Sequence, residues 1–272
     1  MAVGADRPVV LVGAGNMGGA MLLGWLKSGL AAQSILVIDP QPSDATKARL
    51  AEAGVRHVSE APAGLRAGIL FLAVKPQVMD KVLSPLRSLI DEESVVVSVA
   101  AGKTLRFMES HLGEAGMVRA MPNTPAMVGR GVTGAFANAR VSEAQRQIVT
   151  DLLKVSGPVE WVATEADIDS VTAVSGSGPA YVFYLVECMA EAGRKLGLPA
   201  DLAMRLARET VAGAGELLHQ SSEDAAKLRQ NVTSPGGTTA AALSVLMAED
   251  AMQPLFDRAI AAARQRAEEL GS

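Results

Sequence analysis

The sequence predicts an α/β protein with a doubly wound, mostly parallel sheet in its first half and an all-helical domain in its second half. Short, continuous apolar runs alternate with helical stretches as far as about residue 163, and strand-like runs then stop. The composition supports a folded core, because 49% of the 272 residues are hydrophobic and 20% are charged. We therefore expect two domains, residues 1–163 and residues 164–272.

Five apolar runs in the first half are the expected strands. They are continuous rather than alternating, which is typical of strands that are buried on both faces of a parallel sheet. The runs are Val9–Gly13, Ile35–Asp39, Ile69–Val74, Ser94–Ala100 and Met117–Met121. Helices are expected between them, near Asn16–Ser28, Ser43–Ala53, Pro76–Ile90 and Thr104–Leu112. Two more runs, Val132–Ala137 and Pro158–Val162, flank an expected helix at Ser142–Val155 and are predicted to extend the sheet antiparallel at one edge.

The sequence of the second half predicts four helices, three of which have a proline at or just before their start. The expected helices are Pro179–Leu196, Pro199–His219, Gly237–Met247 and Asp250–Leu270. The first of them is apolar almost all round, so it must be buried on every side. Because the remaining helices are too few to cover it, we expect a second copy of the chain to do so. This half is therefore predicted to be a dimerisation domain.

Composition and charge exclude several classes of protein. With a net charge of −4 the chain has no basic stripe for nucleic acid, and its single cysteine, Cys188, excludes a disulfide framework. The three histidines are scattered, so no metal site is expected. The 18 residues Val9–Leu26 carry no charge, but five glycines and Asn16 interrupt them and no basic region precedes them. We expect no membrane span here and a cytoplasmic location.

The first chemical motif is Gly13-Ala14-Gly15-Asn16-Met17-Gly18, which lies between an expected strand and an expected helix. In such a motif Gly13 permits the tight turn, Gly15 lets the backbone approach a pyrophosphate, and Gly18 lets helix and strand pack closely. Asp39 ends the next strand, 21 residues after Gly18, where it would bind the ribose hydroxyls of a dinucleotide and repel a 2′-phosphate. Dinucleotide binding is predicted; the alternative is a glycine-rich turn without a ligand.

Two further segments follow expected strands at the edge of the sheet where ligands bind. In Ala73–Gln77, Lys75 either lies along the cofactor or is a solvated lysine that opens a helix. In Met121–Pro125, two prolines fix the loop, and Asn123 offers a donor and an acceptor. Such an amide suits a nicotinamide carboxamide or a backbone clamp, and an ordinary rigid turn is the alternative.

The segment Val232–Thr239 bends sharply at Pro-Gly-Gly and runs into an expected helix. The N–H groups of Gly237, Thr238 and Thr239 are expected to be free at the helix start, and Ser234 adds a further hydroxyl. Together these groups make a pocket for a carboxylate or phosphate without any arginine. The alternative is a plain threonine N-cap.

The stretch VTAVSGSGPAY at Val171–Tyr181, together with the SPGGTT segment, strongly resembles the pyrroline-5-carboxylate reductase family. The GAGNMG, AVKPQ and MPNTP segments match the same family in order and spacing, so the resemblance covers essentially the whole chain. It implies a Rossmann-type doubly wound sheet followed by an all-helical dimerisation domain, often assembled into rings such as a decamer. The implied activity is NADH- or NADPH-dependent reduction of the cyclic imine Δ1-pyrroline-5-carboxylate to L-proline, the final step of proline biosynthesis.

The resemblance also implies roles for individual residues. Besides the glycine motif and Asp39, the cofactor contacts would be Ala73, Val74, Lys75, Pro76, Ala101, Asn123 and Asn231. The substrate contacts would be Glu165, Ser234, Gly237, Thr238 and Thr239. Reduction of an imine needs positioning more than acid catalysis, so no catalytic histidine is expected. Thr239 is assigned to orient the imine nitrogen and to relay a proton with water. Because Lys47 is the first cation after Asp39, NADH is expected to be used at least as well as NADPH.

Two alternative functions remain beside this interpretation. A β-hydroxyacid dehydrogenase would need a catalytic lysine on the first helix of the helical domain and its own glycine-rich substrate loop, and Ser175–Tyr181 has neither. A non-catalytic nicotinamide-sensing regulator would not need the intact SPGGTT segment.

Overall fold

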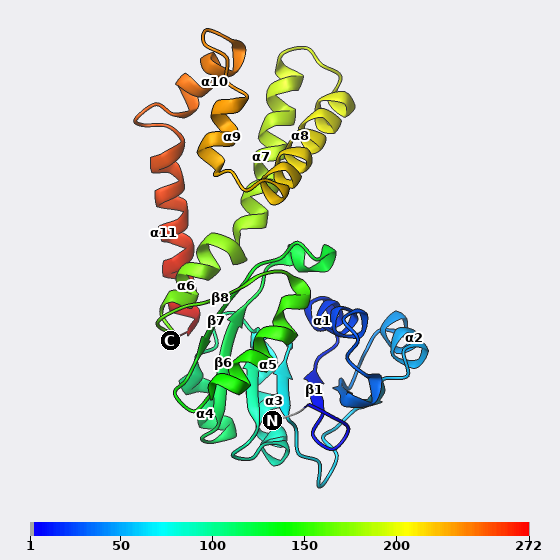
Figure 1. Ribbon diagram of the computed structural model, residues 1–272. Helices are drawn as coiled ribbons and strands as arrows, with labels where there is room; N and C mark the ends of the chain where they lie inside the picture. Colours follow the sequence, from blue (N-terminus) through cyan, green and yellow to red (C-terminus); the bar gives the residue numbers. More distant parts are fainter. Residues whose placement is uncertain (1–2, 272) are drawn as a thin grey trace. The chain divides into compact units, whose positions relative to one another are not determined.

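The computed structural model describes residues 3–271 and divides into two compact units (Figure 1). The first unit runs to Gly176 and also takes in the chain from Ala263 onward; the second is Ser177–Ala262. The boundary expected at residues 163 and 164 falls inside the first unit, because the short helix α6 (Asp167–Val171) packs against its sheet. Each unit is described by itself.

An eight-stranded sheet forms the centre of the first unit, in the order β3-β2-β1-β4-β5-β6-β7-β8. The strands are β1 (Val9–Val12), β2 (Ile35–Ile38), β3 (Arg56–Val58), β4 (Ile69–Leu72), β5 (Val95–Ser98), β6 (Gly116–Met121), β7 (Thr133–Ala137) and β8 (Val159–Trp161). The six strands from β3 to β6 are parallel. Strand β7 pairs antiparallel with β6, and β8 runs parallel to β7, which confirms the predicted antiparallel extension at one edge.

Helices cover both faces of this sheet, as a doubly wound fold requires (Figure 1). One face carries α1 (Asn16–Lys27), α2 (Asp44–Glu52) and α5 (Glu143–Leu153), and the other carries α3 (Met79–Leu86) and α4 (Leu105–Leu112). Along β1, Val9 and Leu11 point into the first apolar cluster and Val10 and Val12 into the second. The central strands β1, β2 and β4 are apolar at every position because both of their faces are covered.

Two local features differ from the sequence prediction. The helix expected at Pro76–Ile90 is split into the 3₁₀ turn η2 (Pro76–Val78), α3 and the 3₁₀ turn η3 (Arg87–Leu89). Pro85 lies inside α3, and because proline lacks an N–H the α-helix ends shortly after it. The edge strand β3 was not predicted, since its three residues mix Arg56 and His57 with a single valine.

The second unit contains α7 (Gly178–Lys195), α8 (Ala200–Gln220), α9 (Ala225–Asn231), α10 (Thr238–Leu246) and the start of α11 (Met252–Gly271). A single turn of π-helix, η6 (Thr172–Gly176), precedes α7 and ends the first segment of the first unit. The four predicted helices are present, and α9 is an additional helix that lacks a strong apolar pattern.

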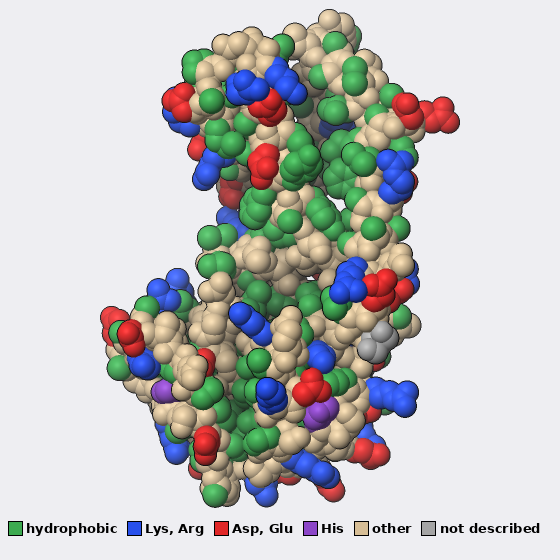
Figure 2. All heavy atoms as spheres, turned by 180° about the vertical axis from the view of Figure 1, so that it is seen from behind, with side chains coloured by type: hydrophobic (Ala, Val, Ile, Leu, Met, Phe, Trp, Pro, Cys, Tyr) green, Lys and Arg blue, Asp and Glu red, His purple; other side chains and the backbone are tan. Residues whose placement is uncertain are grey.

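The second unit buries very little of its apolar surface within one chain. In the described helices α7 to α10 the buried residues are Ala190, Ala203 and Ala207. By contrast, Phe183 is 63% exposed and Tyr184 66% exposed, and Figure 2 shows hydrophobic side chains gathered over the surface of these helices. An apolar surface of this extent marks an interaction site, as the sequence predicts for α7.

Within residues 3–271, none of the helices has both the length and the apolar character that crossing a membrane requires.

Candidate active site

The candidate cofactor residues of the first unit lie on loops that follow adjacent strands. Strand β1 pairs with β4 in register, so the glycine motif and the Ala73–Pro76 segment leave the sheet side by side. The helices that follow these strands, α1 and α3, pack on opposite faces of the sheet. This is the switch point where open α/β sheets bind ligands, outside the carboxyl ends of the strands. Ala101 follows β5 and Asn123 follows β6 at the same edge.

The glycine motif is tightly packed at Gly13 and Gly18 and open at Gly15. Gly13 has φ +87°, and a Cβ there would lie 2.8 Å from Cγ1 of Val74; a Cβ at Gly18 would overlap the carbonyl oxygen of Gly13. A Cβ at Gly15 would meet no heavy atom within 4 Å. No side chain caps the start of α1, so its first N–H groups can receive an anion. The motif therefore fits a dinucleotide whose pyrophosphate lies over the helix N-terminus.

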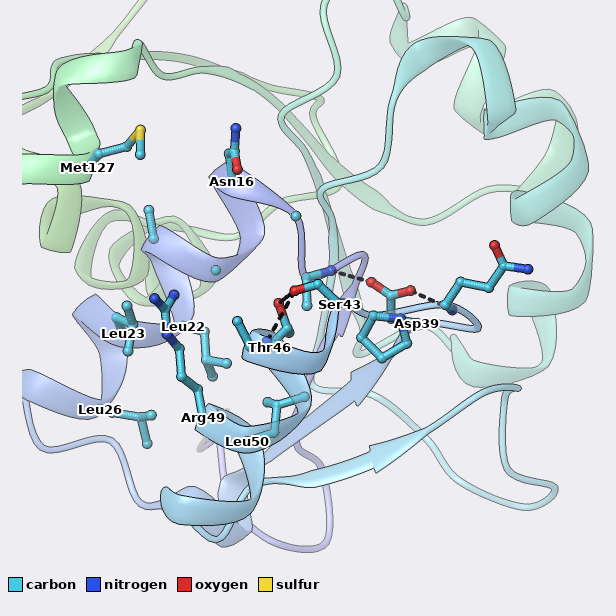
Figure 3. Close-up of a pocket in the computed structure, with 17 residues that line it drawn as sticks. Asn16, Leu22, Leu23, Leu26, Asp39, Ser43, Thr46, Arg49, Leu50 and Met127 are labelled. Carbon is cyan, nitrogen blue, oxygen red and sulfur yellow. Dashed lines mark hydrogen bonds between the residues drawn. The ribbon is translucent and has the colours of Figure 1, made fainter.

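Asp39 is bonded to the glycine motif. Its Oδ2 accepts a hydrogen bond from the Ala14 N–H (2.9 Å), and its Oδ1 accepts one from the Gln41 N–H (3.0 Å), as Figure 3 shows. Asp39 lines an open pocket of about 520 Å³ to which α1 and α2 contribute. The carboxylate thus serves the loop as well as any ligand in the pocket.

The α2 side of this pocket carries residues that were not predicted as functional. Ser43 caps α2 by accepting the Thr46 N–H (3.2 Å), and the two hydroxyl oxygens are 2.9 Å apart. Arg49 lines the pocket and extends from α2 toward α1 (Figure 3). Lys47, which is the first cation after Asp39 in the sequence, is paired with Asp44 (3.3 Å). Spacing along a helix could have indicated Arg49, because residues 43, 46 and 49 recur on one face at intervals of three.

The loop that follows β5 is held by the end of α11. Ala101 is exposed on this loop, whereas the next residue, Gly102, is buried with φ +68°. A Cβ at Gly102 would lie 2.8 Å from Cβ of Leu270, so only glycine allows the helix end to pack so closely. A Cβ at Gly271 would likewise lie 3.5 Å from the Cγ2 of Thr104, on the same loop.

Asn123 clamps two backbone segments together. Its Nδ2 donates to the carbonyl oxygen of Ser175 (3.2 Å), and its Oδ1 accepts from the Val132 N–H (3.0 Å). Of the roles left open by the sequence, the structure shows the backbone clamp, which ties the loop after β6 to the π-helical turn η6.

Glu165 belongs to a charged cluster that the sequence did not predict. Its Oε1 accepts the N–H of Leu105, the first residue of α4, at 2.7 Å and lies 3.5 Å from a guanidinium nitrogen of Arg119. Arg119 also contacts Asp169 at 2.7 Å. The available signal was a single arginine inside an otherwise apolar strand, since such a charge requires buried partners.

The candidate substrate segment lies in the second unit, between α9 and α10. The Gly237 N–H donates to the Ser234 carbonyl oxygen (3.0 Å), so the expectation that it is free was wrong: the chain turns back on itself before α10. The N–H groups of Thr238 and Thr239 precede the first intrahelical bond of α10, which runs from Ala241 to Gly237 (3.1 Å). No side chain caps this helix, so the structure does not show the threonine N-cap.

Asn231 ends α9 in the same unit, and its Nδ2 donates to Oε2 of Glu223 (2.9 Å). Among the predicted residues, the structure therefore brings together two groups, one along the sheet edge of the first unit and one around the start of α10.

Comparison with known proteins gives matches over nearly the entire chain. Residues 165–270 match the family model described as pyrroline-5-carboxylate reductase dimerisation, and residues 8–102 match the model described as NADP oxidoreductase, coenzyme F420-dependent. A pyrroline-5-carboxylate reductase of Pseudomonas aeruginosa is 41% identical over 265 residues, 96% of each chain. That of Escherichia coli is 38% identical over 89% of this chain and 90% of its own.

Solved structures agree with these matches. A pyrroline-5-carboxylate reductase from Coxiella burnetii superposes with a TM-score of 0.90 at 35% identity, covering 98% of this chain and 99% of its own. The NADP-bound enzyme from Plasmodium falciparum has a TM-score of 0.80 at 28% identity, with the same coverage. The matches show an oxidoreductase that uses a nicotinamide cofactor and forms a homo-oligomer through its helical half. By its sequence and its fold, the chain belongs to the pyrroline-5-carboxylate reductase family.

Proposed function

We propose that residues 1–163 hold the dinucleotide and residues 164–272 supply the groups that hold the substrate and join the subunits. The reaction that follows from family membership is the reduction of Δ1-pyrroline-5-carboxylate to L-proline. The observation that carries the proposal is the glycine motif, packed tightly at Gly13 and Gly18 and open at Gly15.

The residues of the first unit bind and orient the cofactor. The motif from Gly13 to Gly18 receives the pyrophosphate, and Asp39 receives the ribose. The further contacts are Ala73, Val74, Lys75, Pro76, Ala101 and Asn123, with Asn231 from the helical half. When bound, the reduced nicotinamide supplies the hydride. Asn123 contributes by holding its loop against Ser175, since its amide groups are bonded to the backbone.

The substrate carboxylate and ring nitrogen are assigned to the segment Gly237–Thr239, in which Gly237 shapes the turn because its N–H is bonded to Ser234. The N–H groups of Thr238 and Thr239 support this assignment, because they point out of an uncapped helix start and favour an anion. Ser234 and Glu165 complete the set. The Thr239 hydroxyl orients the imine nitrogen and passes a proton with water, so the chain supplies mainly position rather than strong acid catalysis.

NADH is proposed to be used at least as well as NADPH. A 2′-phosphate near Asp39 would bring a charge of about −2 close to a carboxylate, which is unfavourable in a partly buried pocket. Arg49 also lines this pocket, and the variant Arg49→Gln separates its contribution from that of Asp39.

The homo-oligomer is proposed to be a dimer through the helical half, with a ring such as a decamer as the higher assembly. The exposed apolar side chains of α7 support the dimer. A cytoplasmic location stays a prediction of the sequence.

A direct assay tests the function. Purified protein is mixed with NADH and pyrroline-5-carboxylate, and the loss of absorbance at the nicotinamide band is followed together with proline formation. Reduction without added metal is expected. Turnover of a β-hydroxyacid instead would favour the dehydrogenase alternative, and dinucleotide binding without turnover of either substrate would favour the regulator.

A further inference from the structure

A buried arginine with two carboxylate partners lies in the first unit, next to the start of α4. Arg119 lies within β6, and its side chain is 2% exposed. Its guanidinium contacts Asp169 at 2.7 Å and Glu165 at 3.5 Å, and these carboxylates are 13% and 29% exposed. The cluster joins the middle of the sheet to the chain segment around α6.

Stability alone does not explain this arginine. Its Nε is buried and has no hydrogen-bond partner within the described residues, so the burial of the charge is incompletely compensated. Well-packed apolar residues often replace a buried ion pair with no loss of stability, or with a gain. An arginine at this position therefore suggests a role in placing its partners.

The partner that matters is Glu165, because its two oxygens are not equivalent. Oε1 accepts the Leu105 N–H and faces Arg119, whereas Oε2 has no partner in the part of the chain that the structure describes. Leu105 begins α4, directly after the loop that carries Ala101. One oxygen is thus fixed to the fold beside the loop that carries Ala101, and the other makes no hydrogen bond within the described residues.

We propose that Arg119 is a positioning residue: it fixes the Glu165 carboxylate so that Oε1 holds the start of α4 and Oε2 is presented to the substrate. Asp169 anchors the other side of the guanidinium and keeps it in place. This inference rests on the proposed substrate contact of Glu165. Arg119 itself does not touch the substrate.

A double-mutant cycle tests the coupling. Arg119→Met, Glu165→Gln and the double variant are compared by kcat and KM for pyrroline-5-carboxylate and by the Kd for NADH measured without substrate. We expect each single variant to raise the KM for pyrroline-5-carboxylate on the order of tenfold, since a hydrogen bond to a charged group is affected. In the double variant, the replacement of Arg119 should raise KM by less than about twofold beyond the effect of Glu165→Gln, because the group that Arg119 positions is already altered. The Kd for NADH should stay within about threefold.

Arg7→Met is the matched control, because Arg7 also pairs with a carboxylate, that of Asp91 (2.6 Å), but at the opposite end of the strands. It should change thermal unfolding without changing KM. Should Arg119→Met fail to fold, the cycle is run with Arg119→Lys, which keeps the charge but loses the two-sided contact.

The outcomes separate the two claims. Suppose that Glu165→Gln raises KM, and that Arg119→Met raises KM by the same factor whether or not Glu165 is replaced. Arg119 then acts independently of Glu165, and the positioning role is overturned. The same holds if Arg119→Met leaves KM unchanged. If Glu165→Gln leaves KM unchanged while the enzyme remains active, the substrate contact of Glu165 fails, and the positioning role fails with it.

Discussion

The Asp39 carboxylate accepts a hydrogen bond from the Ala14 backbone N–H, with 2.9 Å between Oδ2 and the nitrogen. This bond links the residue that follows β2 to the glycine motif that follows β1. The charge that is proposed to select the cofactor therefore belongs to the same side chain that braces the glycine motif. Substitutions at this position must be chosen to separate the two effects.

The first prediction concerns the choice of cofactor. Asp39→Ser should raise the ratio of kcat/KM for NADPH to that for NADH on the order of tenfold, because the repulsion of a 2′-phosphate is removed. Asp39→Asn keeps an acceptor for the Ala14 N–H and should raise the ratio with less loss of NADH binding. The measurement is kcat/KM with both cofactors at one salt concentration.

Two further variants serve as controls for that measurement. Asp44→Ser removes the same charge from an exposed position on α2 and should leave the ratio unchanged. Arg49→Gln tests whether the cation of the pocket supports a 2′-phosphate; if it does, the variant lowers NADPH use selectively. A wild-type preference for NADPH of tenfold or more would show that the argument from Asp39 is wrong.

Thr239→Ala should lower kcat on the order of 10- to 100-fold, because a hydroxyl that contacts the reacting ring contributes a few kcal/mol to the transition state. The Kd for NADH, measured by fluorescence, should change little, and Thr239→Ser should restore most of the activity. Thr233→Ala removes a hydroxyl that is bonded to the Arg229 carbonyl oxygen (2.6 Å) and serves as the control. Unchanged turnover of Thr239→Ala would remove this threonine from the mechanism.

The smallest active unit should be a dimer. Phe183 is 63% exposed on α7, and a charge at this position should be incompatible with a buried interface. We expect Phe183→Asp to sediment as a monomer and to lose activity, while Ser84→Asp, which adds the same charge to an exposed position of α3, behaves like wild type. An active monomer in sedimentation at assay concentration would contradict the prediction.

The ion pair of Arg7 with Asp91 should make stability depend on pH. The two hydrogen bonds from the Arg7 guanidinium hold the pKa of Asp91 well below its ordinary value of 3.8. Because Asp91 has a lower pKa in the folded state than in the unfolded state, its ionisation stabilises the fold at pH values above the unfolded-state pKa. This contribution is lost as the pH falls from the unfolded-state pKa toward the folded-state pKa. Asp91→Asn should therefore reduce the free energy of unfolding by about 1 kcal/mol at pH 7.

Below pH 3.8 the difference between wild type and Asp91→Asn should shrink as the wild-type carboxylate becomes protonated. Urea unfolding at several pH values and one protein concentration measures this difference. Asp44→Asn, at an exposed pair with Lys47, is the control and should change the free energy of unfolding far less at any pH. A constant difference down to the lowest pH would show that the pair contributes nothing through ionisation.

The parallel sheet was predictable because burial on both faces leaves a local trace in the sequence: the five runs that were predicted as parallel strands are mostly apolar, and Arg119 is the one charged residue in their interiors. Strand β3 left no such trace, since it is a three-residue edge strand with exposed Arg56. The π-helical turn at Thr172–Gly176 was not predictable either, because its contact with Asn123 joins residues 52 positions apart. Local patterns cannot specify pairings of this kind.

The residues of the candidate site also divide into those whose roles local sequence patterns predict and those whose roles they do not. Gly13, Gly15 and Gly18 could be assigned roles from spacing alone, and the packing around Gly13 and Gly18 agrees with those roles. The arginine inside an apolar strand indicated that Arg119 has buried partners, but the partners could not be named, because the bond to Asp169 spans 50 residues. The bond between Gly237 and Ser234 was missed because the sequence indicates a turn without specifying which N–H group closes it.

The packing of Leu270 against Gly102 has a consequence for how the chain folds as it leaves the ribosome. Helix α11 contributes its end to the first unit, so this unit lacks a packing element until residue 270 has been synthesised. The sheet can assemble early, since its strands all lie within the first 161 residues. The loop that carries Ala101 receives this support only after α11 has left the ribosome. Maturation of the nucleotide site during translation should therefore lag behind the appearance of the sheet.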